Sequence, residues 1–252
     1  MTKRLDVLGT GFDRVDLAAA TRILLERILH GQRAFVITAN PEFVMLARSD
    51  GELHRIAEAA DLVVPDGTGV VVASRLLGEP LPGRAPGRLV VDALVARAPA
   101  LGVSFYLLGA GEGVARRAAE RLRARHPDLA VVGAEAGDPA PASDDDVVSR
   151  IAAAAPQVLL VAYGMPAQEK WIARNLVRLP SVRVAMGVGG VLDQLAGTAR
   201  VPPRLVHSIG LEWLWRLVNE PRRWRRQRVL PLFALLVLLQ RAQRTARPSA
   251  TA

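Results

Sequence analysis

The sequence predicts an α/β fold with a mostly parallel sheet, helices on both faces of that sheet, and a helical appendage at the C-terminus. Short β-branched or apolar runs alternate along the chain with longer segments of helical periodicity. Several of the short runs are apolar at nearly every position, which is typical of strands buried on both faces. After about residue 190 no strand pattern remains. The first two observations predict the sheet, and the third predicts the appendage.

Six strands and six helical segments are expected before that point. The expected strands span residues 33–39, 61–65, 103–109, 129–137, 157–164 and 181–190. The expected helices span residues 41–60 (with a break at 50–51), 67–77, 88–100, 110–127, 143–156 and 165–179. Because each helical segment lies between two strands, the strands can all run in the same direction.

Local signals justify several of these boundaries. Asn40 stands before a proline, a favourable N-cap followed by proline at the first helical position. Gly78 ends the helix at 67–77. The proline- and glycine-rich stretch "EPLPGRAPG" (79–87) is expected to be a loop. Ser143 is expected to cap the helix that follows it, which has acidic residues in its first turn.

The positive charge is concentrated at the C-terminus. The chain has 252 residues and a formal net charge of +9, and nine arginines against two glutamates follow residue 211. We therefore expect two parts, an α/β domain at 1–195 and an arginine-rich helical appendage at 196–252. A localised basic surface indicates an anionic partner such as a phosphate, a nucleic acid or an acidic lipid.

Composition also limits the function. The chain has no cysteine, which excludes a disulfide framework, a thiol nucleophile and a cysteine-based zinc site. Its four histidines are scattered, and no metal site or cofactor is expected. The N-terminus lacks the apolar core of a signal peptide. The apolar run at 229–239 is shorter than the roughly 20 residues of a bilayer span. We expect a cytoplasmic protein that can lie on a membrane.

In parallel sheets, ligands bind beyond the carboxyl ends of the strands. The loops at those ends read "TANPE", "PDGTG", "LGAGEG", "AYGMPAQE" and "MGVGG". Asp66, in "PDGTG", stands at the end of an apolar strand. It is either a general base, a carboxylate that removes a proton from an acceptor hydroxyl, or a cap for the helix at 67–77. The residues alone leave these two roles open.

The other loops carry neutral polar side chains and glycines. Thr38 and Asn40 suit sugar hydroxyl groups, although spacing alone favours a capping role for Asn40; the two roles are compatible. Gln168 and Glu169 are candidates for nucleotide binding. Gln168 can pair with the edge of a base or with a sugar, whereas Glu169 is also explained by the favourable position of an acid at a helix start. The glycine candidates for nucleotide binding, whose backbone can come close to a ligand, are Gly109, Gly111, Gly164, Gly187 and Gly189.

"LGAGEG" (108–113) is ambiguous by itself. Backbone amides in such a turn can hold a phosphate, but a plain tight turn has the same composition. The spacing is not the dinucleotide pattern G-x-G-x-x-G, and no ribose-binding acid follows at the end of the next strand. The motif therefore argues against an NAD-dependent enzyme.

The tail also has more than one interpretation. Arginine mixed with Trp, Leu and Phe is typical of helices that lie in a membrane interface. Arginine also binds diphosphates through paired hydrogen bonds. A nucleic-acid-binding tail would have the charge, but no nucleic-acid-binding module is recognisable and the apolar run would be unexplained. A buried C-terminal helix with a solvated basic face remains the plain alternative.

Six segments together resemble one family. They are "TANPEFVMLA", "DLVVPDGTGVVVASRLLG", "GMPAQEKW", "MGVGGVLDQLAG", "RVPP" and "IGLEWLWRLVNEPRRWRR". In this order and at these separations they resemble the WecG/TagA/CpsF family of bacterial glycosyltransferases, over roughly residues 5 to 228. The resemblance implies a Rossmann-like catalytic domain and an inverting, metal-independent transfer of a sugar from a UDP-sugar. The implied acceptor is undecaprenyl-diphosphate-linked GlcNAc at the cytoplasmic face of the membrane, in cell-surface polysaccharide or teichoic acid synthesis.

The resemblance also implies roles for particular residues. Asp66 matches the proposed general base, Thr38 and Asn40 match polar pocket residues, and Gln168 matches a residue on the nucleotide side. Four arginines are implied to lie near the substrates or the lipid diphosphate: Arg84, Arg216, Arg223 and Arg226. The appendage is implied to close the site and to touch the membrane.

One segment departs from the family pattern. In "GRAPGRLVVD", Arg88 stands where the family usually has an acid, and Gly83 replaces the preceding acid. The helix start in this region and the choice of donor are therefore open. The donor is an N-acetylmannosamine-type sugar or another hexose, and a homo-oligomer is compatible with the sequence. Two other functions remain as alternatives: a non-catalytic nucleotide-sugar or lipid-binding module, and a basic nucleic-acid-binding protein.

Overall fold

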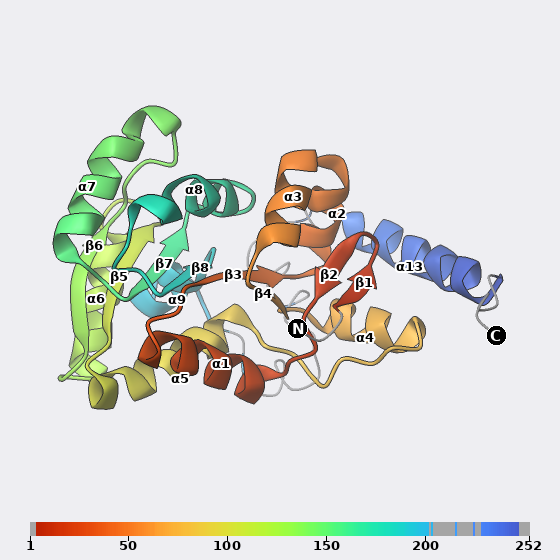
Figure 1. Ribbon diagram of the computed structural model, residues 1–252, viewed down its shortest axis with the longest axis horizontal. Coiled ribbons are helices and arrows are strands. Elements are labelled where there is room, and N and C mark those ends of the chain that lie inside the picture. Colours follow the sequence, from red (N-terminus) through yellow and green to blue (C-terminus); the bar gives the residue numbers. More distant parts are fainter. Residues whose placement is uncertain (1–3, 202, 204–214, 216–223, 225–227, 247–252) are drawn as a thin grey trace.

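The computed structural model describes residues 4–201, 203, 215, 224 and 228–246. At its centre lies a six-stranded parallel sheet with helices on both faces, followed by a C-terminal helix that extends from the body (Figure 1). This confirms the predicted fold class, an α/β Rossmann-like domain with a helical appendage. The domain boundary near residue 195 stays a prediction.

All six expected strands belong to this sheet, and they are parallel to their neighbours. In chain order they are β3 (Ala34–Ala39), β4 (Leu62–Pro65), β5 (Ser104–Gly109), β6 (Ala130–Glu135), β7 (Val158–Ala162) and β8 (Val184–Gly187). Their order across the sheet is β4-β3-β8-β7-β5-β6. The chain moves outward from β3 to β4 and then crosses to the other side for β5. The boundary between β3 and β8 is therefore the point at which the strand order reverses.

Two hydrophobic cores lie on the two faces of the sheet, because alternate side chains of each strand point to opposite faces. One core is covered by α1 (Leu17–Leu29), α5 (Gly87–Leu101), α6 (Val114–Arg125) and α9 (Val191–Ala196). The other is covered by α2 (Pro41–Ser49), α3 (Gly51–Ala59), α4 (Thr68–Leu76), α7 (Asp144–Ala154) and α8 (Ala167–Asn175). Short 3-10 turns, η1 (Pro141–Ser143) and η2 (Leu176–Arg178), precede α7 and follow α8.

The sequence analysis placed no element before residue 33, where the structure has a hairpin and a helix. Strands β1 (Leu5–Val7) and β2 (Thr10–Phe12) pair in an antiparallel hairpin, followed by α1. The Asp13 carboxylate accepts a hydrogen bond from the backbone N–H of Val63 (2.7 Å), which ties the hairpin to β4. Strands of three residues are too short to show a period in the sequence, which explains why the hairpin was missed.

The expected caps have different outcomes. Asn40 caps α2, since its Oδ1 accepts a hydrogen bond from the backbone N–H of Phe43 at 2.9 Å. The break between α2 and α3 is confirmed, and Asp50 caps α3. Ser143 is the N-cap residue of α7, as predicted, but its side chain makes no capping hydrogen bond. Its hydroxyl donates to the carboxylate of Asp138 (2.8 Å) and caps no N–H of α7, because the chain enters that helix through η1.

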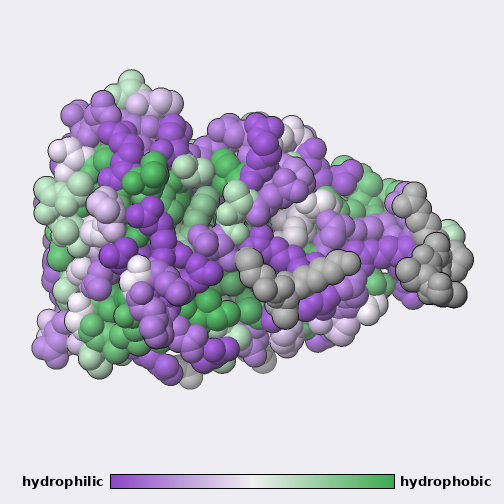
Figure 2. Space-filling view, in the orientation of Figure 1, coloured by the Kyte–Doolittle hydropathy of each residue, from purple (hydrophilic) through white to green (hydrophobic). Residues whose placement is uncertain are grey.

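The C-terminal helix α13 (Val229–Ala246) docks through one narrow stripe. Its Phe233 and Val237 are buried against the core on the side of α2 and α4. Four leucines on the same helix are exposed, at 48–53% of their surface: Leu232, Leu235, Leu238 and Leu239. Hydrophobic surface is visible along α13, next to hydrophilic side chains (Figure 2). None of the helices in the described part of the chain combines the length and hydropathy needed to cross a bilayer.

Candidate active site

The carboxyl ends of β3, β4 and β8 bring together most of the predicted site. Ala39 and Pro65 are paired in the parallel register of β3 and β4, so the next residues, Asn40 and Asp66, leave the sheet side by side. The backbone N–H of Asp66 donates to the carbonyl of Ala39 at 3.0 Å. This edge lies at the reversal of strand order, where ligands bind in open α/β sheets.

Asp66 is held by the segment that leads into α5. Its Oδ1 accepts a hydrogen bond from the backbone N–H of Gly87 at 3.0 Å, and the N–H of Ala85 donates to the carbonyl of Pro65 at 2.8 Å. Gly87 is the first residue of α5, so this carboxylate satisfies one of the donors at the start of that helix. The cap position of α4 is Gly67 and not Asp66. The capping role considered for Asp66 therefore applies to a helix 21 residues further along.

Thr38 and Asn40 both make contacts within the protein. Thr38 is buried, and its hydroxyl donates to the carbonyl of Gly187 at 3.2 Å, which joins β3 to the end of β8. Asn40 uses its side-chain oxygen as the cap of α2. A Cβ on Gly87 would lie 3.1 Å from the Thr38 methyl carbon, so the start of α5 closes tightly over Thr38. Their roles as sugar-binding residues stay predictions.

Gln168 connects the loops that follow β7 and β8. Its Oε1 accepts hydrogen bonds from the backbone N–H groups of Gly164 (3.2 Å) and Gly189 (3.0 Å), and its Nε2 donates to Glu169 (2.8 Å). A Cβ on Gly187 would come within 2.6 Å of Gln168 Nε2, which requires glycine there. Thus Gln168, Glu169, Gly164, Gly187 and Gly189 form one cluster beside Thr38.

Burial changes the acidity of Glu169. The residue is 1% exposed, and its removal from water raises the pKa of the carboxyl to about 7. The hydrogen bond from Gln168 acts in the opposite direction, towards a lower pKa. In this position Glu169 reaches the site edge through Gln168.

Gly109 and Gly111 lie two strands away from β8, at the end of β5. Gly109 has a φ of +104°, and a Cβ there would lie 2.7 Å from the carbonyl carbon of Ala162. The close approach of β5 to β7 therefore requires glycine at this position, which is a structural reason of its own. A role of these two glycines in holding phosphate stays a prediction.

Residues 83–88, which lead into α5, border the site. Arg84 donates from Nη1 to the hydroxyl of Thr68 at 3.2 Å, close to the start of α4. Arg88 lies in the first turn of α5, where the helix dipole does not favour a positive charge. Its guanidinium pairs with Asp92 (3.1 Å) and donates to Gln194 of α9 (3.3 Å). The start of α5 is therefore formed without an acidic residue in its first turn.

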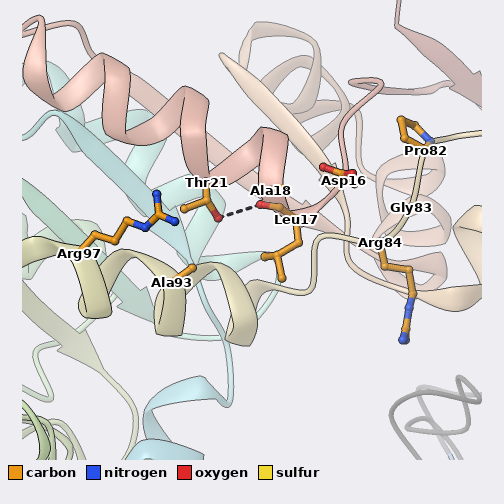
Figure 3. Close-up of a pocket in the computed structure, with 9 residues that line it drawn as sticks. All are labelled: Asp16, Leu17, Ala18, Thr21, Pro82, Gly83, Arg84, Ala93 and Arg97. Atoms are coloured by element: carbon orange, nitrogen blue, oxygen red, sulfur yellow. Dashed lines mark hydrogen bonds between the residues drawn. The ribbon is translucent and has the colours of Figure 1, made fainter.

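A pocket of about 550 Å³ adjoins this segment on the side of α1 and α5. Its lining residues are Asp16, Leu17, Ala18, Thr21, Pro82, Gly83, Arg84, Ala93 and Arg97. Arg84 is the one predicted site residue in this lining, and its side chain extends away from Asp16 (Figure 3). The pocket thus shares Arg84 with the predicted site, and its lining contains no residue of the Gln168 cluster.

The partners of three predicted residues could not be predicted from the sequence. Asp66 is bound by Gly87, Arg84 binds Thr68, and Arg88 binds Gln194. None of these contacts is local in the sequence. The tail arginines Arg216, Arg223 and Arg226 lie outside the described residues. Among those residues, no group of three or more His, Asp or Glu side chains could hold a metal ion.

Comparisons with known proteins agree with the resemblance. A family described as "Glycosyl transferase WecG/TagA/CpsF family" matches residues 5–247. A relative from Bacillus spizizenii is 32% identical over 218 residues, 86% of this chain and 83% of the relative. One from Staphylococcus aureus (strain MRSA252) is 31% identical over 234 residues, 92% of this chain and 91% of the relative. Both relatives are named N-acetylglucosaminyldiphosphoundecaprenol N-acetyl-beta-D-mannosaminyltransferase.

Proposed function

The chain belongs to the WecG/TagA/CpsF family of glycosyltransferases, and on that basis we propose that it transfers a hexose from a UDP-sugar to undecaprenyl-diphosphate-linked GlcNAc. The favoured sugar is N-acetylmannosamine, because both relatives described above carry that activity in their names. Such a product belongs to the synthesis of cell-surface polysaccharide or teichoic acid.

One observation carries the chemical part of the proposal. Asp66 follows β4, which neighbours the reversal of strand order between β3 and β8, and the backbone N–H of Gly87 binds its carboxylate. In the proposed reaction this carboxylate takes the proton of an acceptor hydroxyl. The resulting oxygen forms a bond to the anomeric carbon of the donor, while the bond to UDP breaks and UDP leaves with its electron pair. A single displacement of this kind inverts the anomeric centre and needs no protein nucleophile.

Arginines neutralise the diphosphates in this proposal, and the transfer is metal-independent. Arg84 lies near the start of α4 through its bond to Thr68. Arg216, Arg223 and Arg226 would act on the lipid diphosphate through paired hydrogen bonds. Arginine suits this task because its planar group matches the geometry of phosphate oxygens.

We also propose that the protein works as a peripheral protein on the membrane that holds the acceptor lipid. The four exposed leucines of α13 offer apolar side chains to the lipid, and Arg228 and Arg241 are exposed on or next to the same helix. Leucine with arginine is the composition of helices that lie in an interface.

A transfer assay tests the proposed function. Release of UDP would be measured with a panel of UDP-sugars, with and without a short-chain prenyl-diphosphate-GlcNAc acceptor. We expect acceptor-dependent release with one donor, and UDP-N-acetylmannosamine is the first to try. Folded protein that binds UDP-sugars but releases no UDP with any donor would contradict the proposal and favour a non-catalytic binding module.

A further inference from the structure

The amide of Gln168 is fixed by partners on both of its ends. Two backbone N–H groups, those of Gly164 and Gly189, point at Oε1 from distances of 3.2 and 3.0 Å. Only an oxygen can accept both bonds, so the NH₂ end of the amide must face the other way. There its Nε2 donates to Oε1 of Glu169 at 2.8 Å. The orientation of the amide is therefore determined by its surroundings.

Glu169 has no second task in the described part of the chain. Its Oε2 is buried without a hydrogen-bond partner among those residues, and the Glu169 side chain is 1% exposed. A buried carboxyl with an unpaired oxygen is costly, so a purely structural role would be better filled by an apolar residue. Among the described residues, the carboxylate of Glu169 interacts with its own backbone N–H and with one other residue, Gln168.

In the described part of the chain, one of the two donors of the Gln168 amide has no partner, and the residue is 2% exposed. An NH₂ group has two protons, and Glu169 accepts one of them. No partner for the other is found among the described residues. Nε2 lies against Gly187, where a Cβ would come within 2.6 Å, and Gly187 in turn accepts from Thr38. Nε2 thus lies at the end of β8, next to the residue that binds Thr38.

We infer that Glu169 is a positioning residue, whose carboxylate holds the Gln168 amide so that Gln168 joins the loops after β7 and β8 and turns its remaining N–H towards an oxygen of the bound donor. The last part rests on the proposed function, since it assumes a sugar nucleotide in the site. The first part concerns the protein alone and holds or fails without any substrate.

Charged neighbours do not account for the raised pKa of Glu169. Strands β3, β7 and β8, which pack against α8, contain no charged residue. The charged side chains on α3, η2 and α8 itself are Glu52, His54, Arg55, Glu58, Lys170, Arg174 and Arg178. None of them contributes to the raised pKa of Glu169, which comes from burial. A pH effect at Gln168 near neutrality would therefore report on Glu169.

The test compares two replacements of Glu169 with Gln168→Ala. Glu169→Gln keeps an oxygen that can accept from Gln168, whereas Glu169→Leu removes it. In the transfer assay we expect Glu169→Leu and Gln168→Ala each to raise KM for the donor, about 3- to 10-fold for one lost hydrogen bond, with a smaller change in kcat. Glu169→Gln should have a KM for the donor close to that of the wild type, because its side-chain oxygen still accepts from Gln168. The double variant Gln168→Ala/Glu169→Leu should be no worse than Gln168→Ala alone, because Glu169 acts through Gln168. Additive losses in the double variant would overturn the inference.

A second readout needs no activity. In NMR spectra of the wild type, the backbone amide signals of Gly164 and Gly189 should titrate with an apparent pKa near 7, the value of Glu169. These signals should not titrate in Glu169→Gln. In the control Glu120→Gln, which changes an exposed glutamate, they should titrate as in the wild type. Signals that titrate alike in wild type and Glu169→Gln would refute the positioning role. If the NMR signals behave as expected but KM for the donor is unchanged in the variants, Glu169 positions Gln168 and the proposed contact to the donor is wrong.

Discussion

Oδ1 of Asp66 accepts a hydrogen bond from the backbone N–H of Gly87 at 3.0 Å, and this bond joins the end of β4 to the start of α5. The N-terminus of a helix favours a negative charge nearby, so the contact orients the carboxylate at the start of α5. The same bond places the catalytic candidate in a fixed position before any substrate arrives. A base of this kind loses little entropy when the acceptor hydroxyl reaches it.

Replacing Asp66 by Asn should nearly abolish transfer while the protein stays folded. Asn keeps an oxygen that can accept from Gly87 but cannot take a proton, and the loss of a general base lowers rates by about 10²–10⁴. The measurement is acceptor-dependent UDP release, with a thermal melt of the same preparation. Activity within threefold of the wild type at an unchanged melting temperature would rule out Asp66 as the base.

Local chemistry explains what the sequence could predict. Asn40 was expected as a cap because a cap and its helix are adjacent in the chain, and the six strands were found because each is a continuous apolar run. The partner of Asp66 could not be predicted in this way, since Gly87 comes 21 residues later and meets Asp66 only when β4 and α5 are assembled. The same holds for the contact between Arg88 and Gln194.

Helix α1 was not predicted, although the sequence contains a signal for it. Helix α1 begins after Asp16, which accepts a hydrogen bond from Ala19, and its buried residues Ala20, Leu24, Leu25 and Ile28 have helical spacing. Periodicity alone could have found this helix. The hairpin of β1 and β2 has no such signal, because its alternation extends over only three residues in each strand.

Gly69→Ala should destabilise the protein, although alanine favours helices. A Cβ at Gly69 would lie 2.7 Å from the Cγ of Pro41, a rigid ring at the start of α2. The two helices must then move apart next to Asn40 and Asp66, and overpacking of this kind costs about 1–3 kcal/mol. Urea unfolding measures the loss. The control is Gly51→Ala, whose Cβ meets only the end of a flexible arginine at 3.8 Å. Equal stability of the two variants would show that α4 adapts freely.

Glu169 should make the protein less stable as the pH rises from 5 to 8. Burial raises the pKa of this carboxyl from 4.5 to about 7, so the folded protein binds a proton that the unfolded chain has released. The penalty is absent below pH 4.5, grows as the pH rises, and is complete above about 7, where a shift of this size corresponds to roughly 3 kcal/mol. Glu169→Gln should remove this pH dependence, as measured by urea unfolding at several pH values. A wild type and variant whose difference in unfolding free energy stays constant from pH 5 to 8 would contradict it.

Arg244 should anchor the end of α13 without adding much global stability. Its guanidinium pairs with Glu79 (2.9 Å) and donates to the carbonyl of Asp6 (2.9 Å), and its side chain is 32% exposed. Pairs of this exposure contribute about 0.2–1 kcal/mol each. Arg244→Ala should therefore speed amide hydrogen exchange in residues 229–246 and leave the melting temperature almost unchanged. Arg241→Ala, an exposed arginine on the same helix, serves as the control. Equal exchange in both variants would show that the other contacts of α13, namely Phe233, Val237 and the hydrogen bonds of Gln240 to Asp6 and Leu8, hold the helix without Arg244.

The exposed leucines of α13 should carry the apolar part of membrane binding. Leu232, Leu235, Leu238 and Leu239 are about half exposed on a helix whose buried stripe is Phe233 and Val237, so their replacement by Gln leaves the docking contact in place. Each leucine transferred into lipid contributes on the order of 1 kcal/mol, and the fourfold variant should bind anionic vesicles at least tenfold more weakly.

Salt and a control variant separate this contribution from charge and from self-association. Arginine–lipid attraction is screened at high ionic strength, whereas the leucine contribution persists. We therefore expect the difference between wild type and variant to remain in 0.5–1 M salt, a range in which the Debye length falls to about 3 Å. Leu29→Gln/Val177→Gln changes two exposed apolar residues far from α13 and should bind as the wild type does. If the fourfold variant binds vesicles normally but changes its sedimentation from an oligomer to a monomer, the leucines contact a second copy of the chain and not the membrane.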